Sequence, residues 1–414
     1  MIRRALAALC FAAGLGWGLP AQAGWVGAWY MAPQAVPQAA DAPPYLRAPW
    51  IDDATVREIV RPTIAGTALR LRISNRYGVE PLHLGAVTVG VARGIGAVVP
   101  GTLRRVTFGG RSTVVIPPGG AVVSDPVPAP VVARRALAVS LYVPGRVRPR
   151  TWHQIAGRVN FLSARGDHSR DASGAAFLHR NTHILWLDGV DVRARHGWAV
   201  VAIGDSITDG LRATLNAQQR WPDALSRRLR AAGIDTVAVL NAGISGNRLL
   251  HDSACYGQSL EARFARDALD RPGVRAVIVL IGINDINFAD MPPRRGLDCD
   301  APHARVSAAD LIDGYRRLIA QAHARGVKIY AATLTPAALP ATREAVRRQV
   351  NAWLRNSGAF DGVADFDAAL RDPLRPARLR PQADSGDGIH PSDAGDRMLA
   401  DAVPLAWFRS AAGR

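Results

Sequence analysis

Four short polar segments carry the residue types that hydrolytic chemistry requires. They are residues 204–210 (GDSITDG), 241–247 (NAGISGN), 282–285 (GIND) and 387–391 (DGIHP). The first three follow apolar runs directly, and all four contain glycine beside serine, asparagine, aspartate or histidine. A serine, a histidine and an aspartate together can supply a nucleophile, a base and a group that orients the base. Packing requirements alone do not explain four such segments in one chain.

In order and spacing, these segments resemble the sequence blocks of the SGNH hydrolase superfamily, which includes the GDSL esterases and lipases. The resemblance covers residues 197–405, about half of the chain. The matching positions are Ser206 as nucleophile, Asp387 and His390 as its triad partners, and Gly246 and Asn284 as oxyanion-hole donors beside the backbone of Ser206. The family implies hydrolysis of carboxylic esters through an acyl-enzyme, and we expect neither a cofactor nor a metal.

The chemistry of ester cleavage leads to the same roles. A serine hydroxyl is a poor nucleophile until a base removes its proton, which the neutral imidazole of His390 can do. Asp387, three residues earlier, can orient the second ring nitrogen. The backbone N–H groups of Ser206 and Gly246 and the side-chain amide of Asn284 can then bind the oxyanion. The sequence has no G-x-S-x-G elbow, which argues against the α/β-hydrolase fold.

Several of these residues also have structural interpretations. Ser206 can cap the helix that follows it, His390 can start a helix, and Asn284 can serve a turn alone. We expect Asp209 and Asp285 to hold loops by accepting hydrogen bonds from backbone N–H groups.

Two further groups of side chains contain residue types that can bind a sugar or a metal. The Trp152-His153 pair fits either a sugar contact or a core, and the core is favoured. His179 and His183 have the spacing of metal ligands but lack additional ligands, so no zinc site is predicted. No G-x-G-x-x-G or P-loop pattern occurs, and no nucleotide is implied.

The elements that must position these residues change in type near residue 197. Beyond it, apolar strands alternate with helices, which predicts a parallel sheet covered on both faces. The expected strands are 199–203, 236–240, 274–281, 327–333 and 362–366, and the expected helices are 221–232 and one with its apolar face at 311–322. The fold class is α/β: residues 197–414 form a flavodoxin-like, three-layer α/β/α SGNH hydrolase domain with a five-stranded parallel sheet. Functional residues of such folds lie at the carboxyl ends of the strands.

The pattern of residues 24–196 predicts short strands separated by glycine and proline. The strands expected are 68–74, 82–91, 112–116 and 136–143, with a turn at 117–120. This pattern predicts an all-β, jelly-roll-like sandwich domain.

Residues 1–23 have the features of a cleavable signal peptide. Arg3 and Arg4 precede an apolar run that ends in an A-x-A motif at Ala23. Cys10 follows the bulky Leu9, which disfavours a lipoprotein. We therefore predict a secreted or periplasmic protein.

Two cysteines remain after processing, Cys255 and Cys299. In an exported chain this number favours a disulfide between them, with two free thiols as the alternative. The bridge would connect the loops that follow Gly246 and Asn284.

Composition excludes several structural classes, and net charge favours some classes of binding partner over others. The 414 residues are 48% hydrophobic and 21% charged, which excludes collagen, coiled coil and low-complexity disorder. The net charge is +17, and residues 24–196 hold 21 basic but only 10 acidic side chains. Export argues against nucleic acid as the partner of this charge, and an acidic polysaccharide or envelope surface fits better. A basic surface that serves only solubility remains the alternative. The longest later apolar run, 276–283, is too short for a transmembrane segment.

Together these features predict a serine esterase that removes acetyl or other short acyl groups from a polysaccharide. A lipase or lysophospholipase acting on envelope lipids, and an acyltransferase with the same triad, remain as alternatives. A catalytically silent carbohydrate-binding module is disfavoured by the complete triad. The oligomeric state is not predicted.

Overall fold

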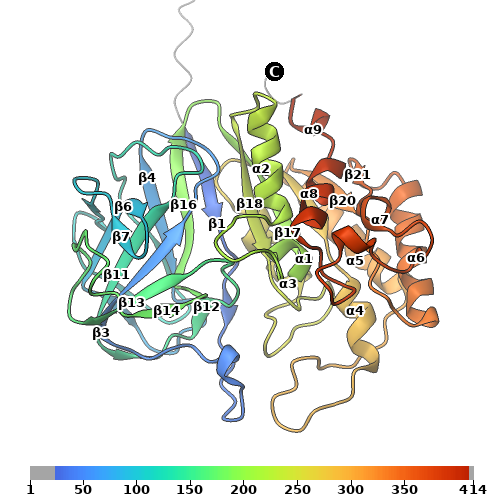
Figure 1. Cartoon of the computed structure of the whole chain (residues 1–414), viewed down its shortest axis with the longest axis horizontal. Helices are drawn as coiled ribbons and strands as arrows, with labels where there is room; N and C mark the ends of the chain where they lie inside the picture. Colours follow the sequence, from blue (N-terminus) through green and yellow to red (C-terminus); the bar gives the residue numbers. More distant parts are fainter. Residues whose placement is uncertain (1–23, 410–414) are drawn as a thin grey trace, which may run out of the picture.

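The computed structural model describes residues 24–409, so the predicted signal peptide lies outside the described residues. An antiparallel β domain stands beside an α/β domain (Figure 1). The β domain contains β1 (Gly24–Tyr30), β2 (Gln34–Ala35), the 3-10 helix η1 (Pro44–Leu46), β3 (Ile51–Val60), β4 (Leu69–Ser74), β5 (Leu82–Leu84), β6 (Ala86–Arg93), β7 (Ala97–Val98), β8 (Arg104–Arg105), β9 (Val114–Ile116), β10 (Ala121–Val123), β11 (Leu137–Val147), β12 (Thr151–His153), β13 (Asn160–Arg165), β14 (His179–Asn181), β15 (Ile184–Leu185) and β16 (Leu187–Ala194).

Two larger sheets dominate the β domain, in the orders β1-β16-β4-β10 and β14-β13-β3-β11-β6-β7. In β4, Leu69, Leu71 and Ile73 are buried while the arginines between them are partly exposed, as expected for a strand with one face in the core. The segment predicted as one strand over 82–91 is two strands, β5 and β6. The chain changes partner at Gly85, which lies against the ring of Tyr142 where a Cβ would come within 2.7 Å of that ring.

The α/β domain begins with β17, and its sheet has the order β18-β17-β19-β20-β21 with all neighbouring strands parallel. Its elements are β17 (Trp198–Gly204), α1 (Ser206–Asp209), α2 (Trp221–Ala231), β18 (Val237–Gly243), α3 (Leu260–Phe264), the π-helix η2 (Ala265–Leu269), β19 (Val274–Leu280), α4 (Ile283–Asn287), η3 (Phe288–Asp290), α5 (Ala308–His323), β20 (Lys328–Ala332), α6 (Ala341–Asn356), β21 (Val363–Ala364), α7 (Phe366–Leu370), η4 (Pro381–Ala383), α8 (Asp393–Ala402) and α9 (Ala406–Arg409). The predicted five-stranded parallel sheet is confirmed.

Local sequence explains where these elements start and stop. Ser307 caps α5 through a capping box with Asp310, and the helix buries its apolar face from Leu311 to Ala322. The fifth strand is shorter than predicted, because Asp365 caps α7 and the helix already begins at Phe366.

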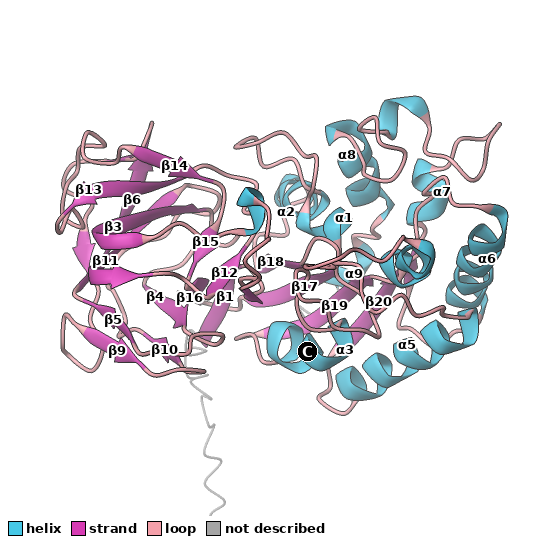
Figure 2. Cartoon of the chain, turned by 90° about the horizontal axis from the view of Figure 1, so that it is seen from below, coloured by secondary structure: helices cyan, strands magenta, loops and turns pink. Residues whose placement is uncertain are grey.

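Helices cover both faces of the parallel sheet, with α2 and α8 on one side and α3 and α5 on the other (Figure 2). The loops that leave the carboxyl ends of β17, β18 and β19 therefore meet at one edge. No described helix has both the length and the apolar character to cross a bilayer.

The β domain covers the outer edge of this sheet. β18 is the edge strand, and β1 lies alongside it in both views (Figures 1 and 2). Thr63 Oγ1 accepts from the N–H of Val239 at 3.0 Å, which satisfies a backbone group that an edge strand leaves unpaired. The single hydrogen of this hydroxyl can donate either to the carbonyl of Ala28 at 3.0 Å or to that of Val239 at 3.1 Å. Tyr30 also donates to the buried carboxylate of Asp267 at 2.8 Å. Buried side chains from both domains form one continuous hydrophobic cluster.

This shared core predicts that a fragment comprising residues 197–414 does not fold as an independent unit. Removal of the β domain exposes the apolar flank of β18 and leaves Asp267 without one of its buried partners. We expect the fragment to lack a cooperative thermal transition in near-ultraviolet circular dichroism. A sharp transition with a melting temperature close to that of the full chain would contradict this expectation.

Candidate active site

Ser206 lies where β17 gives way to α1. Asp205 is the N-cap of α1, and its carboxylate accepts from the N–H of Ile207 at 3.0 Å. Capping is thus performed by Asp205, and Ser206 is the first residue of the helix. The first N–H groups of a helix have no partner within the helix, so the N–H of Ser206 is free to serve as a donor toward a ligand.

The side chain of Ser206 meets His390 across the chain. Ser206 Oγ lies 2.8 Å from His390 Nε2, and His390 Nδ1 lies 2.8 Å from Asp387 Oδ2. An ionised carboxylate only accepts hydrogen bonds, so Nδ1 must donate to Asp387. In the neutral ring this leaves Nε2 to accept from the serine hydroxyl. The three side chains thus have the connectivity of a nucleophile, a base and an orienting carboxylate.

The Asp387 carboxylate is held in its ionised form. Although burial acts to raise its pKa, hydrogen bonds from the N–H groups of His390 and Ile389 and from the His390 ring keep that pKa well below its usual range. The partly exposed Arg212 adds an ion pair, with Nε 3.3 Å from Asp387 Oδ2.

The loops after β18 and β19 carry Gly246 and Asn284, the two other predicted oxyanion donors. Gly246 has φ of 77°, and a Cβ at this position would collide with the ring of Tyr256. Asn284, in the first turn of α4, donates to the carbonyl of Asn247 at 2.9 Å through Nδ2, which has a second hydrogen available. Both residues line the same cavity as Ser206 and His390.

Asp209 and Asp285 hold these loops by hydrogen bonds to backbone, as predicted. Asp209 accepts from the N–H and the hydroxyl of Ser245 at 3.0 and 2.7 Å. Asp285 accepts from the N–H groups of Leu249 and Leu250 at 2.7 and 3.0 Å. The loop that carries Gly246 is therefore anchored at both ends by buried carboxylates.

His153 belongs to the core, the favoured interpretation, and it also touches the site. Its Nε2 lies 3.0 Å from Oδ1 of Asp209, the residue that holds Ser245. The β domain therefore helps to support the loop that carries Gly246.

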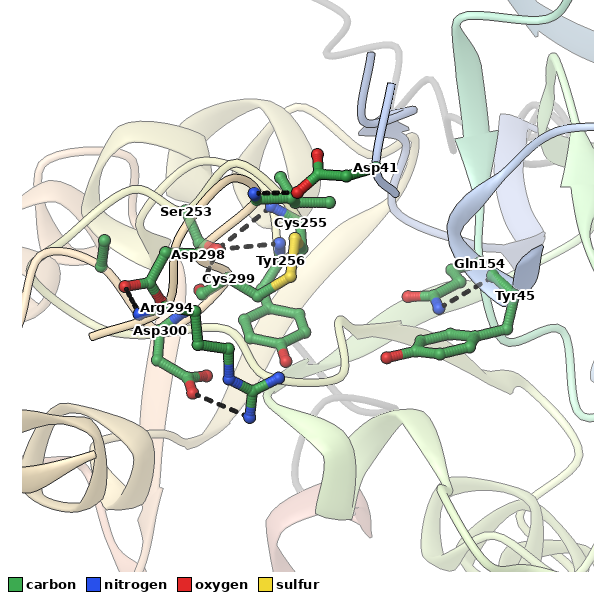
Figure 3. Close-up of a disulfide and its surroundings, with 12 residues drawn as sticks. Asp41, Tyr45, Gln154, Ser253, Cys255, Tyr256, Arg294, Asp298, Cys299 and Asp300 are labelled. Carbon is green, nitrogen blue, oxygen red and sulfur yellow. Dashed lines mark hydrogen bonds and ion pairs between the residues drawn. A yellow bond between two sulfur atoms is a disulfide. The ribbon is translucent and has the colours of Figure 1, made fainter. Parts of the chain in front are cut away.

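The cavity above Ser206 has a volume of about 360 Å³ and a largely apolar lining. Leu211, Ile283, Phe288, Leu339 and Ile389 come from the α/β domain. The β domain supplies Tyr45, Gln154 and Ile155, so the two domains form this cavity together. Figure 3 shows the rings of Tyr45 and Tyr256 on opposite sides of a gap, with their hydroxyl groups turned toward it.

Comparisons with known proteins agree with this geometry. Residues 202–398 match the model of the GDSL-like lipase/acylhydrolase family. This region is a GDSL-type hydrolase domain. The match confirms the SGNH resemblance, and the protein is a carboxylic ester hydrolase. A search of curated proteins found no significant match.

Several solved structures are similar to the GDSL domain. They include a GDSL-like lipase from Bacteroides thetaiotaomicron (16% identity over 51% of this chain and 88% of the other, TM-score 0.37), an acetylxylan esterase from Geobacillus stearothermophilus (23% identity over 51% and 94%, TM-score 0.39) and an alpha/beta hydrolase enzyme from the metagenome of Lake Arreo (23% identity over 52% and 95%, TM-score 0.37).

The predicted disulfide is present between Cys255 and Cys299, beside the GDSL domain's cavity (Figure 3). Ser253 Oγ donates to the carbonyl of Cys299 at 2.6 Å and accepts from the N–H of Tyr256 at 3.1 Å. The ring of Tyr256 in turn packs against Gly246. The bridge is thus connected to Gly246, a predicted oxyanion donor, through one side chain.

Sequence reasoning missed several residues of the GDSL domain's site. Asp205 lies inside the first polar segment and could have been identified as an N-cap from its position before a helix. Arg212 carries no signal beyond its closeness to Ser206 in sequence. Tyr45, Gln154 and Ile155 gave no signal at all, because their contacts with the site depend on how the two domains pack.

The disulfide is expected to support catalysis as well as stability. It closes a loop with a sequence separation of 44, for which the chain-entropy model gives about 4 kcal/mol of stabilisation. We expect the double variant Cys255→Ser/Cys299→Ser to have a lower melting temperature and a lower kcat, because Tyr256 no longer holds Gly246 in place. Steady-state kinetics at 25 °C test this, and treatment of the variant with dithiothreitol is the control. A variant with reduced melting temperature and normal kcat would limit the bridge to stability.

Asp205 predicts a pH dependence of stability. Burial, together with the nearby Asp285 carboxyl, raises the pKa of Asp205 to about 7 against the opposing effect of the Ile207 N–H. A carboxyl with a raised pKa binds its proton more tightly in the folded chain, so the free energy of unfolding falls as pH rises from about 4 to about 7. Asp205→Asn keeps an oxygen for the cap and removes the titration.

The melting temperature of the wild type should therefore fall more steeply between pH 5 and 8 than that of Asp205→Asn. Parallel curves for the two proteins would show that Asp205 does not titrate in this window.

Proposed function

We propose that the protein is an exported serine esterase with Ser206 as nucleophile, His390 as base and Asp387 as the residue that orients the base. His390 Nε2 takes the proton of Ser206 as Oγ attacks the ester carbonyl carbon. The N–H groups of Ser206 and Gly246 and the amide of Asn284 bind the oxyanion. The alcohol leaves with the proton from His390, and a water molecule, deprotonated by the same ring, hydrolyses the acyl-enzyme.

The observation that carries this proposal is the pair of contacts on either side of the His390 ring, both 2.8 Å long. They join residues from two distant parts of the sequence at the wall of a cavity. Each contact has the length of a strong hydrogen bond.

The substrate we propose is a polysaccharide that carries acetyl or other short acyl groups. A cavity of about 360 Å³ is near the lower end of the range for ligand sites, which favours a short acyl group over a long chain. Tyr45, which is 64% exposed, places an aromatic ring at the mouth of the cavity, where it can stack on a sugar. The β domain's excess of basic side chains fits an acidic polymer.

We further propose that the protein is secreted or periplasmic. The features of residues 1–23 support this, and the Cys255–Cys299 disulfide is of the kind that persists in oxidising compartments.

Substitution of the triad tests the proposed roles. Ser206→Ala should lower kcat on 4-nitrophenyl acetate by about a thousandfold or more, and Asp387→Asn should cost less than His390→Ala, since orienting the base contributes less than being the base. Near-ultraviolet circular dichroism controls for folding. Activity of Ser206→Ala above about 1% of the wild type would remove Ser206 as the nucleophile.

A series of 4-nitrophenyl esters from acetate to palmitate tests the acyl group. We expect kcat/KM to be highest for acetate and to decline with chain length. A maximum at decanoate or beyond would favour a lipase or lysophospholipase. Faster acyl transfer to an added alcohol than to water would favour an acyltransferase.

A further inference from the structure

Four arginines line a cavity of about 430 Å³ that belongs mainly to the β domain. They are Arg61, Arg93, Arg158 and Arg180, and we refer to the cavity that they line as the arginine cavity. No aspartate or glutamate is among the residues that line it. Within residues 24–409, none of the four guanidinium groups has a carboxylate partner or a hydrogen-bond acceptor. The exposed side chains of Arg93 and Arg180 stand where the cavity meets solvent.

The inner part of the arginine cavity has donors that are buried and unused. Arg158 Nε and Nη1 and Arg61 Nε are buried, and they make no hydrogen bond to any described residue. Burial and the repulsion of Arg61 and Arg220 lower the pKa of Arg158 to about 10. The nearby Asp223 carboxylate is already paired with Arg220 at 2.8 Å. An anion that entered the cavity would satisfy these donors and reduce the repulsion.

Two chain segments connect the arginine cavity to the cavity above Ser206. One runs from Gln154 and Ile155, which line the serine cavity, to Arg158. The other runs from Leu211, also in the serine cavity, to Asn216. The segments are joined where the N–H of Asn216 donates to the carbonyl of Gly157 at 3.0 Å. Since three residues span at most about 10 Å, Arg158 lies close to the serine cavity.

A second basic group belongs to the β domain. Trp50, Arg146, Arg148 and Arg150 line a smaller cavity of about 180 Å³ together with one acidic residue, Glu80, and we call the tryptophan and these three arginines the tryptophan patch. Trp50 is 51% exposed, and the guanidinium of Arg146 lies 4.5 Å from the centre of its ring. These arginines also have no carboxylate partner among the described residues.

Both basic groups lie close to the serine cavity along one stretch of chain. Arg150 of the tryptophan patch precedes β12, Gln154 and Ile155 follow β12 and line the serine cavity, and Arg158 of the arginine cavity comes next. Four residues span at most about 14 Å, so two separate groups of positive charge lie near the position where an ester would react. A single charged head group can occupy only one of the two groups, whereas a polymer with repeated negative charges can occupy both.

We propose that the arginine cavity and the tryptophan patch bind carboxylate groups of one acidic polysaccharide whose ester is held at Ser206. This inference rests on the proposed esterase function and adds a substrate class to it. Guanidinium groups pair with carboxylates through two parallel hydrogen bonds, and Trp50 offers a ring on which a sugar can pack.

The test uses the full-length mature protein and three double variants. Arg93→Gln/Arg180→Gln changes the arginine cavity, and Arg146→Gln/Arg148→Gln changes the tryptophan patch. Arg105→Gln/Arg397→Gln is the matched control, since it removes the same charge from exposed side chains that line neither cavity and have no partner among the described residues. All six positions are exposed, so folding should be unaffected, and thermal melting verifies this.

We expect each of the first two variants to lower kcat/KM on acetylated polygalacturonate about tenfold, mainly through KM, and to leave acetylated xylan and 4-nitrophenyl acetate within about twofold of the wild type. The control variant should match the wild type on all three substrates. Equal losses on the acidic and the neutral polymer, or a loss of the same size in the control, would overturn the proposal.

Binding separates this inference from the proposed function. Calorimetry with Ser206→Ala and unacetylated oligogalacturonate requires no hydrolysis, and it should detect binding that weakens about tenfold when either basic group is substituted. Oligogalacturonate binding without esterase activity in the wild type would support carboxylate binding by the two basic groups and would contradict the proposed esterase function. Activity on acetylated xylan without oligogalacturonate binding would support the esterase function and would contradict carboxylate binding by these groups. Equally tight binding of inorganic phosphate, or tighter binding of phosphatidylglycerol vesicles, would overturn the polysaccharide as the ligand.

Discussion

The buried carboxylate of Asp209 connects the three parts of the protein on which the site depends. It lies at the end of α1, the short helix that begins at Ser206. One of its oxygens accepts hydrogen bonds from the N–H and the hydroxyl of Ser245, the residue before Gly246. Its other oxygen meets His153 of the β domain. Since a buried carboxylate must be fully satisfied by donors, these contacts restrict one another. Ser206, the loop that carries Gly246 and the neighbouring domain are therefore positioned together.

The β domain is consequently part of the structure that forms the candidate site. It satisfies the edge of the parallel sheet through Thr63, shares the hydrophobic core, and supplies Tyr45, Gln154 and Ile155 to the cavity above Ser206. A GDSL domain alone would have an open side at this position. The β domain closes it, and the same segment that forms the wall continues into Arg158.

Three aspartates near Ser206 show how surroundings set the charge of one residue type. Burial raises the pKa of Asp205 to about 7 and that of Asp285 to about 6, although Asp285 accepts two backbone N–H groups. Asp387 is more exposed, and the donors around it keep its pKa well below the usual range. Of the three, the carboxylate proposed to orient His390 is therefore the one nearest to solvent and richest in donors.

Much of this arrangement could be predicted from local sequence. Apolar runs followed by polar, glycine-containing segments predicted the parallel sheet, and they identified Ser206, Gly246 and Asn284 as residues of one sheet edge, because parallel strands end on the same side. The spacing of Asp387 and His390 suggested their contact, since three residues in a turn bring a carboxylate to the ring. Local patterns failed where the chain changes partner within an apolar run, as at Gly85, or where a cap ends a strand early, as at Asp365.

Other features were decided only by the tertiary structure. Ser206 and His390 are separated by 184 positions, and a pattern of residue types can suggest their pairing but not its distance. Tyr45, Gln154 and Ile155 look like ordinary loop residues, and the arginines of the two basic groups look like part of a generally basic composition. The contacts of the first three residues with the cavity arise from the packing of one domain against the other, and the burial of Arg61 and Arg158 without hydrogen-bond partners arises mainly from the fold of the β domain. Burial and neighbouring charge depend on contacts between distant segments, and no local stretch of sequence contains that information.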